Sequence, residues 1–249
     1  MNACEFKVVI PARYGSSRLP AKPLLEINNR PIFWHVAQRV LEAGIALADI
    51  VIATDDKRIE SKALEFGLPV VMTAVNHASG TDRVNEVTVK QGWSAETLVI
   101  NVQGDEPLIP PMLIGDLMTF TLKNQNFDIT TAATKINHKA DFFNPNVVKA
   151  ITTEHAQALY FTRSAAPLNR DNPDDLSQAK RHVGIYVYKV AALFSMSTLP
   201  ESALESLEKL EQLRAISNGL TIGVMDFDGD IPHGIDTESD YLTIKKIME

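Results

Sequence analysis

The first half of the chain alternates short apolar runs with amphipathic segments. Continuous apolar runs predict buried strands over 8–10, 50–54, 70–72 and 98–102. Between them, apolar residues recur at helical spacing and predict helices over 32–41, 58–66 and 81–91. Strands that are apolar on both sides and alternate with helices indicate an α/β fold. We therefore expect a Rossmann-like, mostly parallel sheet with helices on both faces.

The second half is less regular. Strands are expected over 128–133, 147–152 and 221–227, and 159–163 fits either a short strand or a turn. Residues 183–190 alternate in polarity, which predicts an antiparallel strand. Leucines recur every three residues from Leu204 to Leu213, so 201–218 is predicted as one helix that ends at Gly219. A polar segment, 169–180, is expected to be a mobile loop, and 238–248 a terminal helix.

Composition narrows the class of protein. A chain of 249 residues suits one large α/β domain, and a net charge of −7 argues against a general nucleic-acid binder. The single cysteine, Cys4, cannot form an internal disulfide and fits a reducing compartment. We see no signal peptide and no apolar run long enough to cross a bilayer. The expectation is a soluble cytoplasmic protein with neither nucleic acid nor membrane as a partner.

The loop after the first apolar run holds the densest group of candidate ligands. Its small and cationic residues are Arg13, Gly15, Ser16, Ser17, Arg18 and Lys22. Small residues let backbone N–H groups approach an anion, and three cations can neutralise a triphosphate. A strand, a basic loop and a helix commonly hold phosphates at the end of a parallel sheet. The loop matches neither the P-loop nor the dinucleotide fingerprint, so an ordinary surface loop remains the alternative.

Two acidic turns are candidate metal sites. Asp105 follows the strand 98–102 directly, where α/β proteins build their sites, and Mg²⁺ prefers few carboxylates together with phosphate oxygens and water. The alternative is that Asp105-Glu106-Pro107 caps a helix near Pro110. Asp236 lies in a second such turn, where a metal ligand is as good an interpretation as an N-cap of the last helix at Asp236 or Thr237.

Other polar groups are less specific. Ser79, Gly80, Thr81 and Arg83 offer hydrogen bonds and a charge between a strand and a helix, although a helix cap near Asp82 explains them as well. Arg163, His182, Tyr186 and Tyr188 form a looser group, in which a histidine before an apolar strand is more often structural. Glu211 and Gln212 lie beside the leucines, where a solvated face is the default. No Ser-His-Asp set and no cysteine–histidine metal cluster stands out.

Eight ordered motifs together resemble a known family. They are V-I-P-A-R-Y-G-S-S-R-L-P-A-K-P-L, M-T-A-V-N-H-A-S-G-T-D-R, N-V-Q-G-D-E-P, F-N-P-N-V-V-K, A-L-Y-F-T-R-S, R-H-V-G-I-Y-V-Y, L-E-K-L-E-Q-L-R and G-I-D-T-E-S-D. This series covers essentially the whole chain and resembles the 3-deoxy-manno-octulosonate (Kdo) cytidylyltransferases. The resemblance implies a nucleotide-diphospho-sugar transferase type of fold. It also implies a reaction of CTP with Kdo that gives CMP-Kdo and pyrophosphate for lipopolysaccharide synthesis.

The resemblance also implies roles for individual residues. Nucleotide ligands would be Pro11, Ala12, Arg13, Ser17, Arg18, Lys22, Ser79, Gly80, Arg83 and Gln103. Lys22, Asp105 and Asp236 would be catalytic, with the two aspartates binding Mg²⁺. The sugar pocket would contain Gln103, Arg163, His182, Tyr186, Glu211 and Gln212. The whole chain, 1–249, would be one domain, in which about 135–200 contributes the sugar pocket and a homodimer interface.

The chain departs from the family pattern at a few positions. Ala21 replaces a usual glycine and is expected to fit only at negative φ. Residues 162–167 depart from the usual S-R-A-x-I-P, close to the expected sugar site, which leaves open an 8-amino-8-deoxy analogue of Kdo as the acceptor. A sialic-acid cytidylyltransferase and a nucleotide-binding module without catalysis remain the further alternatives.

Overall fold

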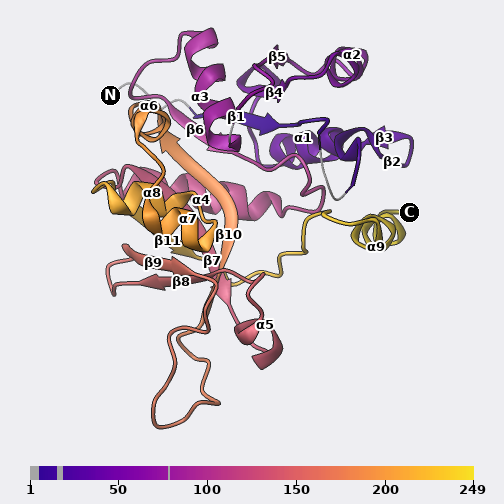
Figure 1. Cartoon of the computed structure of the whole chain (residues 1–249). Coiled ribbons are helices and arrows are strands. Elements are labelled where there is room, and N and C mark those ends of the chain that lie inside the picture. Colours follow the sequence, from indigo (N-terminus) through magenta and orange to yellow (C-terminus); the bar gives the residue numbers. More distant parts are fainter. Residues whose placement is uncertain (1–5, 16–18, 78) are drawn as a thin grey trace.

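A computed structural model describes residues 6–15, 19–77 and 79–249. Among these residues, nine strands form one sheet in the order β11-β7-β10-β6-β1-β4-β5, with β8 and β9 attached beside β10 (Figure 1). The strands are β1 (Phe6–Pro11), β4 (Ile50–Thr54), β5 (Val70–Met72), β6 (Leu98–Asn101), β7 (Ile129–Lys135), β8 (Lys149–Thr152), β9 (Ala158–Thr162), β10 (Lys180–Lys189) and β11 (Ile222–Asp226). The expected strand positions are confirmed to within a few residues.

The direction of the strands divides the sheet. Strands β5, β4, β1 and β6 are parallel neighbours, as the first half of the sequence predicts. The long strand β10 is antiparallel to both β6 and β7, which confirms the prediction made from its alternating polarity. On its far side, β7 pairs in parallel with β11. The sheet is therefore mostly parallel, with one antiparallel strand at its centre.

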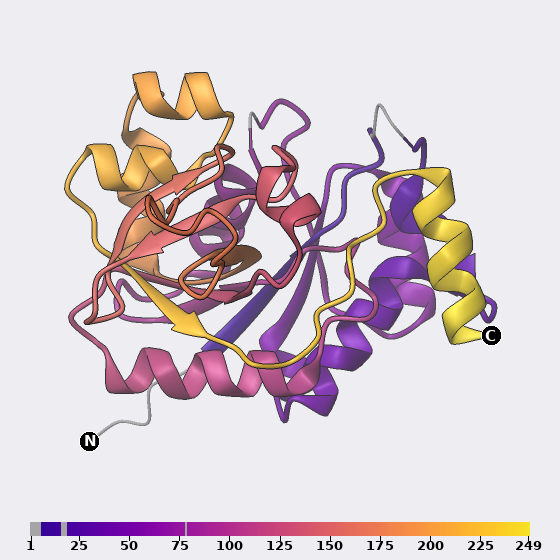
Figure 2. The ribbon, with the colours of Figure 1, turned by 90° about the horizontal axis from the view of Figure 1, so that it is seen from below.

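Helices cover both faces of the sheet, so the predicted fold class is confirmed (Figure 2). One apolar layer packs under α1 (Ile32–Glu42), α2 (Lys57–Glu65) and α4 (Pro111–Lys123). The other packs under α3 (Gly80–Gln91), α6 (Val190–Thr198) and α8 (Gln212–Ser217). None of the helices in the described part of the chain has the length and apolar character needed to cross a bilayer.

The C-terminal segment returns to the N-terminal third of the chain. Helix α9 (Glu238–Met248) packs on the hairpin of β2 (Glu26–Ile27) and β3 (Arg30–Pro31), which Figure 2 shows at the side away from α6. Ile235 and Ile244 are buried there with Ile27 and Ile32. This packing fixes the residues just before α9 beside the loop that follows β1.

A small lobe extends from the outer end of β10. It contains α5 (Lys139–Phe143) and the antiparallel pair β8–β9, with a minor core of Ile136, Phe142, Val147 and Ala179. Residues 163–179 contain neither helix nor strand and project as a long loop in Figure 1.

The prediction of one helix over 201–218 is wrong. The structure has α7 (Ala203–Glu208) and α8 instead, separated at Lys209, whose φ of 53° is left-handed. Leu207 is 81% exposed, so the leucines do not form one buried stripe. The cause is a tertiary contact: the Glu208 carboxylate accepts hydrogen bonds from Thr162 Oγ1 at 2.7 Å and from the Arg163 backbone N–H at 2.9 Å. These bonds tie the end of α7 to β9 and turn the chain there.

Candidate active site

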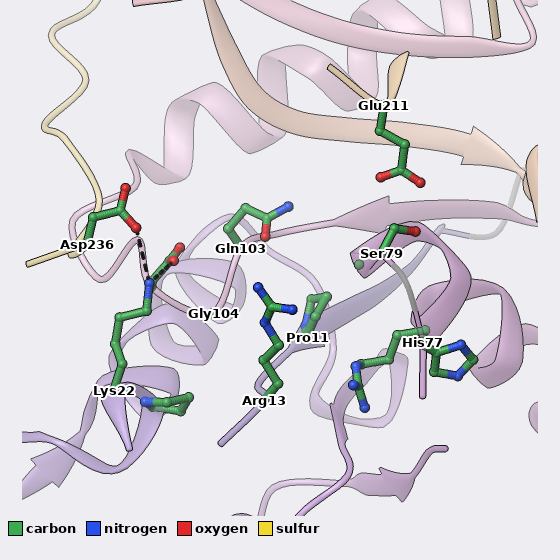
Figure 3. A pocket seen from close by; sticks show the side chains of 13 residues that line it. Pro11, Arg13, Lys22, His77, Ser79, Gln103, Gly104, Glu211 and Asp236 are labelled. Carbon is green, nitrogen blue, oxygen red and sulfur yellow. Dashed lines mark hydrogen bonds and ion pairs between the residues drawn. The ribbon is translucent and has the colours of Figure 1, made fainter. Parts of the chain in front are cut away.

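The largest group of predicted ligands meets at the carboxyl ends of β1 and β6. A pocket of about 330 Å³ opens there between the two halves of the sheet (Figure 3). Its lining residues are Pro11, Arg13, Lys22, Pro23, His77, Ser79, Gly80, Arg83, Gln103, Gly104, Asp105, Glu211 and Asp236. In Figure 3, Lys22 and Asp236 lie at one end, Ser79 and Glu211 at the other, with Arg13 and Gln103 between them.

Gly104 allows the pocket to form. A Cβ atom at this position would lie 2.4 Å from the carbonyl oxygen of Pro11, which no side chain tolerates. The loop after β6 can therefore cross directly over the end of β1 only with glycine at this position. This crossing places the side chains on either side of Gly104, those of Gln103 and Asp105, in the pocket.

Three charged groups converge at one end of the pocket, which we call the charged end. Lys22 Nζ donates to Asp105 Oδ2 at 2.5 Å and to the carbonyl oxygen of Ile235 at 2.8 Å, and it lies 3.4 Å from Asp236 Oδ1. The Lys22 and Asp105 side chains are partly buried, and that of Asp236 is 49% exposed. The docking of α9 brings Asp236 here from the far end of the sequence.

The structure settles where the caps next to these aspartates lie: the cap expected at Asp236 or Thr237 is Thr237, and the cap expected from residues 105–107 is not formed. Thr237 is the N-cap of α9 and Pro110 that of α4, so neither Asp236 nor Asp105 caps a helix. The cap interpretation of the segment near Asp82 is confirmed, because Ser79 caps α3 by accepting from the backbone N–H of Asp82 at 3.1 Å. Asp105 and Asp236 cap no helix in the described part of the chain and line the pocket.

The charged end fits a magnesium ion. Among the described residues, no cluster of three or more His, Cys, Asp or Glu side chains could enclose a metal by itself. Two carboxylates on one side of an open pocket are, however, the kind of partial site that Mg²⁺ completes with phosphate oxygens and water. Both aspartates pair with the Lys22 ammonium, so a cation that binds here would compete with that group for the two carboxylates.

The expectation about Ala21 is wrong. Its φ of 55° and ψ of 21° are left-handed, immediately before Lys22. An L-residue pays roughly 1–2 kcal/mol for this conformation, and the surrounding loop imposes it because Leu24 N–H bonds back to the Ala21 carbonyl at 2.8 Å. Alanine therefore adopts the strained geometry that glycine would adopt freely.

Most of the predicted nucleotide ligands line the pocket together. Pro11, Arg13, Lys22, Ser79, Gly80, Arg83 and Gln103 do so. Ala12 lies beneath it, buried, with its N–H bonded to the Ala53 carbonyl at 2.8 Å. Arg83 is 3% exposed, and its guanidinium donates to Asp55 at 2.7 Å and to Thr73, which fixes it at the pocket wall. Ser17 and Arg18 lie outside the described residues.

A second hollow of about 130 Å³ continues the pocket on the face covered by α3 and α6. We call it the neutral end; it is lined by Gly80, Thr81, Asn101, Gln103, Tyr186, Tyr188, Met196, Glu211 and Gln212. Four of the predicted sugar ligands, Gln103, Tyr186, Glu211 and Gln212, meet here. Burial raises the pKa of Glu211, against hydrogen bonds from Ser79 and Thr81 that lower it.

The structure places Arg163 outside both hollows. Its guanidinium donates to the carbonyl oxygens of Glu208 at 2.6 Å and Pro145 at 2.9 Å. These bonds join β9 to the end of α7 and to the loop before β8. In this structure Arg163 holds the lobe together.

His182 lies one layer behind the neutral end. Its ring packs against Tyr186 with centroids 5.3 Å apart, and its Nε2 lies 3.1 Å from Thr131 Oγ1. Burial lowers the pKa of His182 to about 3, so the ring is neutral at physiological pH. His182 therefore contacts a residue of the neutral end while itself lining a neighbouring hollow with Glu106 and Arg181.

Sequence analysis missed several residues of the site. His77 lines the first pocket, and Asn101 and Met196 line the neutral end. Thr81 and Tyr188, named among the less specific polar groups, line the neutral end as well. Asn101 alone had a usable signal, because it is a polar residue at the end of a continuously apolar strand. Met196 is recognisable only once α6 is placed beside the sheet.

Comparisons with known proteins agree with this geometry. A family model described as cytidylyltransferase matches residues 7–222. The chain is 45% identical over 253 aligned residues to the 3-deoxy-manno-octulosonate cytidylyltransferase of Cellvibrio japonicus, covering 98% of both chains. It is 42% identical to 3-deoxy-manno-octulosonate cytidylyltransferase 2 of Paraburkholderia phytofirmans, covering 99% of this chain and 95% of that one.

Solved structures extend the comparison to the fold. A CMP:2-keto-3-deoxy-manno-octonic acid synthetase complexed with CTP superimposes with a TM-score of 0.90 at 38% identity, covering 98% of each chain. A putative glucose-1-phosphate thymidylyltransferase from Bacillus anthracis shares only the fold, with a TM-score of 0.66 at 14% identity over 98% of this chain and 95% of that one. From the site geometry, the family model and relatives similar over their full length, this chain belongs to the 3-deoxy-manno-octulosonate cytidylyltransferase family.

Proposed function

We propose that the protein transfers the cytidylyl group of CTP to Kdo, giving CMP-Kdo and pyrophosphate for lipopolysaccharide synthesis. The main support is that the two hollows adjoin: the pocket that holds Lys22, Asp105 and Asp236 at its charged end shares the lining residues Gly80, Gln103 and Glu211 with the neutral end. A triphosphate needs the first environment, and a polyhydroxylated sugar needs the second. The relatives, named for Kdo, do not favour sialic acid or a non-catalytic module.

The chain's own residues supply positioning and charge for this transfer. The anomeric hydroxyl of the sugar attacks the α-phosphorus, and the bond from phosphorus to the pyrophosphate oxygen breaks in line with it. Lys22 and Arg13, both on the loop after β1, are placed to neutralise phosphate oxygens. Gln103, which lines both hollows, is placed to contact the sugar and the nucleotide where they meet.

Asp105 and Asp236 would hold Mg²⁺ in this reaction. When bound, the ion polarises the phosphate and acidifies the attacking hydroxyl. The Lys22 ammonium, which bridges the two carboxylates, is then free to exchange them for phosphate oxygens. Its side chain can make this change within the same pocket, since all three groups line it.

The same proposal extends to assembly and location. Exposed apolar side chains on elements of the second half, Leu159, Phe194 and Leu207, support a homodimer formed by that half. The lone cysteine supports a reducing, cytoplasmic location. Light scattering on the purified protein tests the dimer, and Leu207→Glu should shift it to monomers if this surface is the interface.

Pyrophosphate release tests the reaction directly. CTP and Mg²⁺ are supplied with Kdo, with its 8-amino-8-deoxy analogue or with sialic acid in parallel, and with no sugar as the control. We expect release with Kdo. Release with the amino analogue alone would mean that residues 162–167 differ from the family pattern because the protein uses this analogue as its acceptor. If no pyrophosphate is released with any of the three sugars, the proposal is overturned in favour of a nucleotide-binding module.

A further inference from the structure

Asn101 is a polar residue in an apolar layer. As the last residue of β6, it is in register with Val9 of β1 and Tyr186 of β10. Side chains two residues apart on a strand share a face, so Asn101 lies on the same face as Val99, which is fully buried in the core under α3 and α6. Asn101 itself is 2% exposed. A carboxamide in such a layer is costly unless its polar atoms find partners.

The amide oxygen of Asn101 has no such partner within the described part of the chain. The residue lines the neutral end of the pocket, and so does Glu211, whose Oε1 also lacks a hydrogen-bond partner among the described residues. Two buried acceptors thus line one hollow of about 130 Å³. Buried acceptors without partners are rare in folded proteins and commonly mark a functional position.

The wall of the hollow next to Asn101 is aromatic. Tyr186 is the register partner of Asn101 on β10, and its ring stacks with that of Tyr188 at 5.5 Å between centroids. The hollow therefore offers acceptors beside an apolar surface. This combination suits a sugar, which has hydroxyl donors around a C–H framework.

We propose that Asn101 determines specificity for the acceptor: its amide oxygen accepts a hydrogen bond from a hydroxyl of the sugar acid. The inference rests on the proposed function and deepens it. Because two acceptors line this hollow, it receives the hydroxylated part of the sugar, and the sugar's carboxylate, which has only acceptor oxygens, lies elsewhere.

Asn101→Leu tests the proposal, since leucine has nearly the shape of asparagine without its acceptor. We expect the KM for Kdo to rise roughly tenfold, the loss of about one hydrogen bond, with the KM for CTP unchanged. Calorimetry of Kdo binding in the presence of a non-hydrolysable CTP analogue should show the same change in Kd. The melting temperature should hold or rise, because an unpaired buried group is removed.

Deoxy analogues of Kdo sharpen this test. The analogue that lacks the partner hydroxyl should bind equally to the wild type and to Asn101→Leu, whereas the other analogues should still distinguish them. Should leucine prevent folding, Asn101→Thr provides the second variant, since threonine suits a strand and its hydroxyl is too short to replace the amide. It should show the same selective loss of affinity for the sugar.

Asn85 is the matched control. It lies on α3 and likewise has an unpartnered side-chain oxygen among the described residues, but its Nδ2 donates to Ser197 Oγ at 2.9 Å and it lines neither hollow. Asn85→Leu should leave the KM for Kdo within about twofold. Equal effects at both positions, or unchanged sugar affinity in Asn101→Leu, would overturn the inference. Absence of turnover in the wild type would instead refute the proposed function.

Discussion

At the charged end of the pocket the polar groups pair with one another, whereas at the neutral end two buried acceptors lack partners among the residues that the structure describes. Lys22 spans Asp105 and Asp236, all three within reach of solvent. Asn101, at the end of β6, and Glu211, at the start of α8, each carry an oxygen without a partner among the described residues. The charged end must exchange its internal partners for those of a ligand. At the neutral end, a ligand can bond to these two oxygens without displacing a partner within the described part of the chain.

Because of this difference, the two ends should contribute to different free energies: the charged end to the activation free energy of the transfer, and the neutral end to the binding free energy of the sugar. Substitutions at the charged end should act mainly on turnover, because charge develops on the phosphates during the reaction. Substitutions at the neutral end should act on the affinity for the sugar, because the lost contacts are made in ground state and transition state alike.

Removing a carboxylate from the charged end should have the largest effect. In Asp105→Asn and Asp236→Asn, the shape is kept and the ligand charge is lost, so turnover should fall by about a thousandfold or more. Pyrophosphate release measures the loss, and thermal melting checks that the fold remains. Asp228→Asn is the control, because this exposed carboxylate pairs only at the surface with Lys135, at 3.0 Å. Turnover near the wild-type value in either site variant would remove that aspartate from the reaction.

Lys22→Met should separate catalysis from metal binding. Turnover should fall by roughly a hundredfold, because the phosphates lose a cation. Binding of Mn²⁺ without nucleotide, followed by electron paramagnetic resonance, should instead tighten by about tenfold, because the two carboxylates lose the ammonium that now neutralises them. Lys135→Met provides the surface control. Weaker binding of Mn²⁺ in Lys22→Met would mean that the lysine does not compete with the ion.

Gly104→Ala should disturb both ends together. Its Cβ would clash with the Pro11 carbonyl at 2.4 Å, so the crossing of the two strand ends must open, at a cost of about 2 kcal/mol in the free energy of unfolding. Urea denaturation measures this, and both turnover and the KM for Kdo should worsen. Gly115→Ala, in the middle of α4 with no atom within 4 Å of the added Cβ, should be neutral or stabilising. Equal stability of the two variants would contradict the close approach.

His182 should make the layer behind the neutral end sensitive to acid. Burial lowers its pKa to about 3 in the folded protein, while in the unfolded chain the pKa is close to 6.5. Below about pH 6.5 the unfolded state therefore binds a proton that the folded state does not. As the pH decreases from about 6.5 to about 3, the free energy of unfolding therefore decreases by at most about 1.4 kcal/mol per pH unit.

His182→Gln removes this titration, so the variant should gain stability relative to the wild type between about pH 7 and about pH 5. Urea denaturation at both values measures the change. His155→Gln, at an exposed position in the turn between β8 and β9, is the control for losing a histidine. A constant difference between wild type and His182→Gln would show that the folded protein protonates His182 normally.

Local patterns in the sequence predict the charged end better than the neutral end. The parallel strands follow from continuous apolar runs, and Asp105 follows directly from the end of one. The break at Lys209, by contrast, depends on contacts of Glu208 with β9, far away in the sequence. Without that break, Glu211 and Gln212 are predicted on a solvated helix face. The neutral end forms because tertiary contacts break the helix that the leucine spacing predicts.

Ala21 shows the same limit on a smaller scale, since no local pattern predicts a left-handed alanine. Ala21→Gly should relieve its strain and stabilise the protein by about 0.5–1 kcal/mol, after allowing for the freer unfolded chain. Ala156→Gly is the matched control, because Ala156 has a φ of 61° in the turn between β8 and β9, away from the pocket. Both should raise the melting temperature similarly. If Ala21→Gly alone also changes Mn²⁺ binding, the strained alanine holds Lys22 between the carboxylates. If the two variants behave alike in every assay, the position of Lys22 is set by its ion pairs alone.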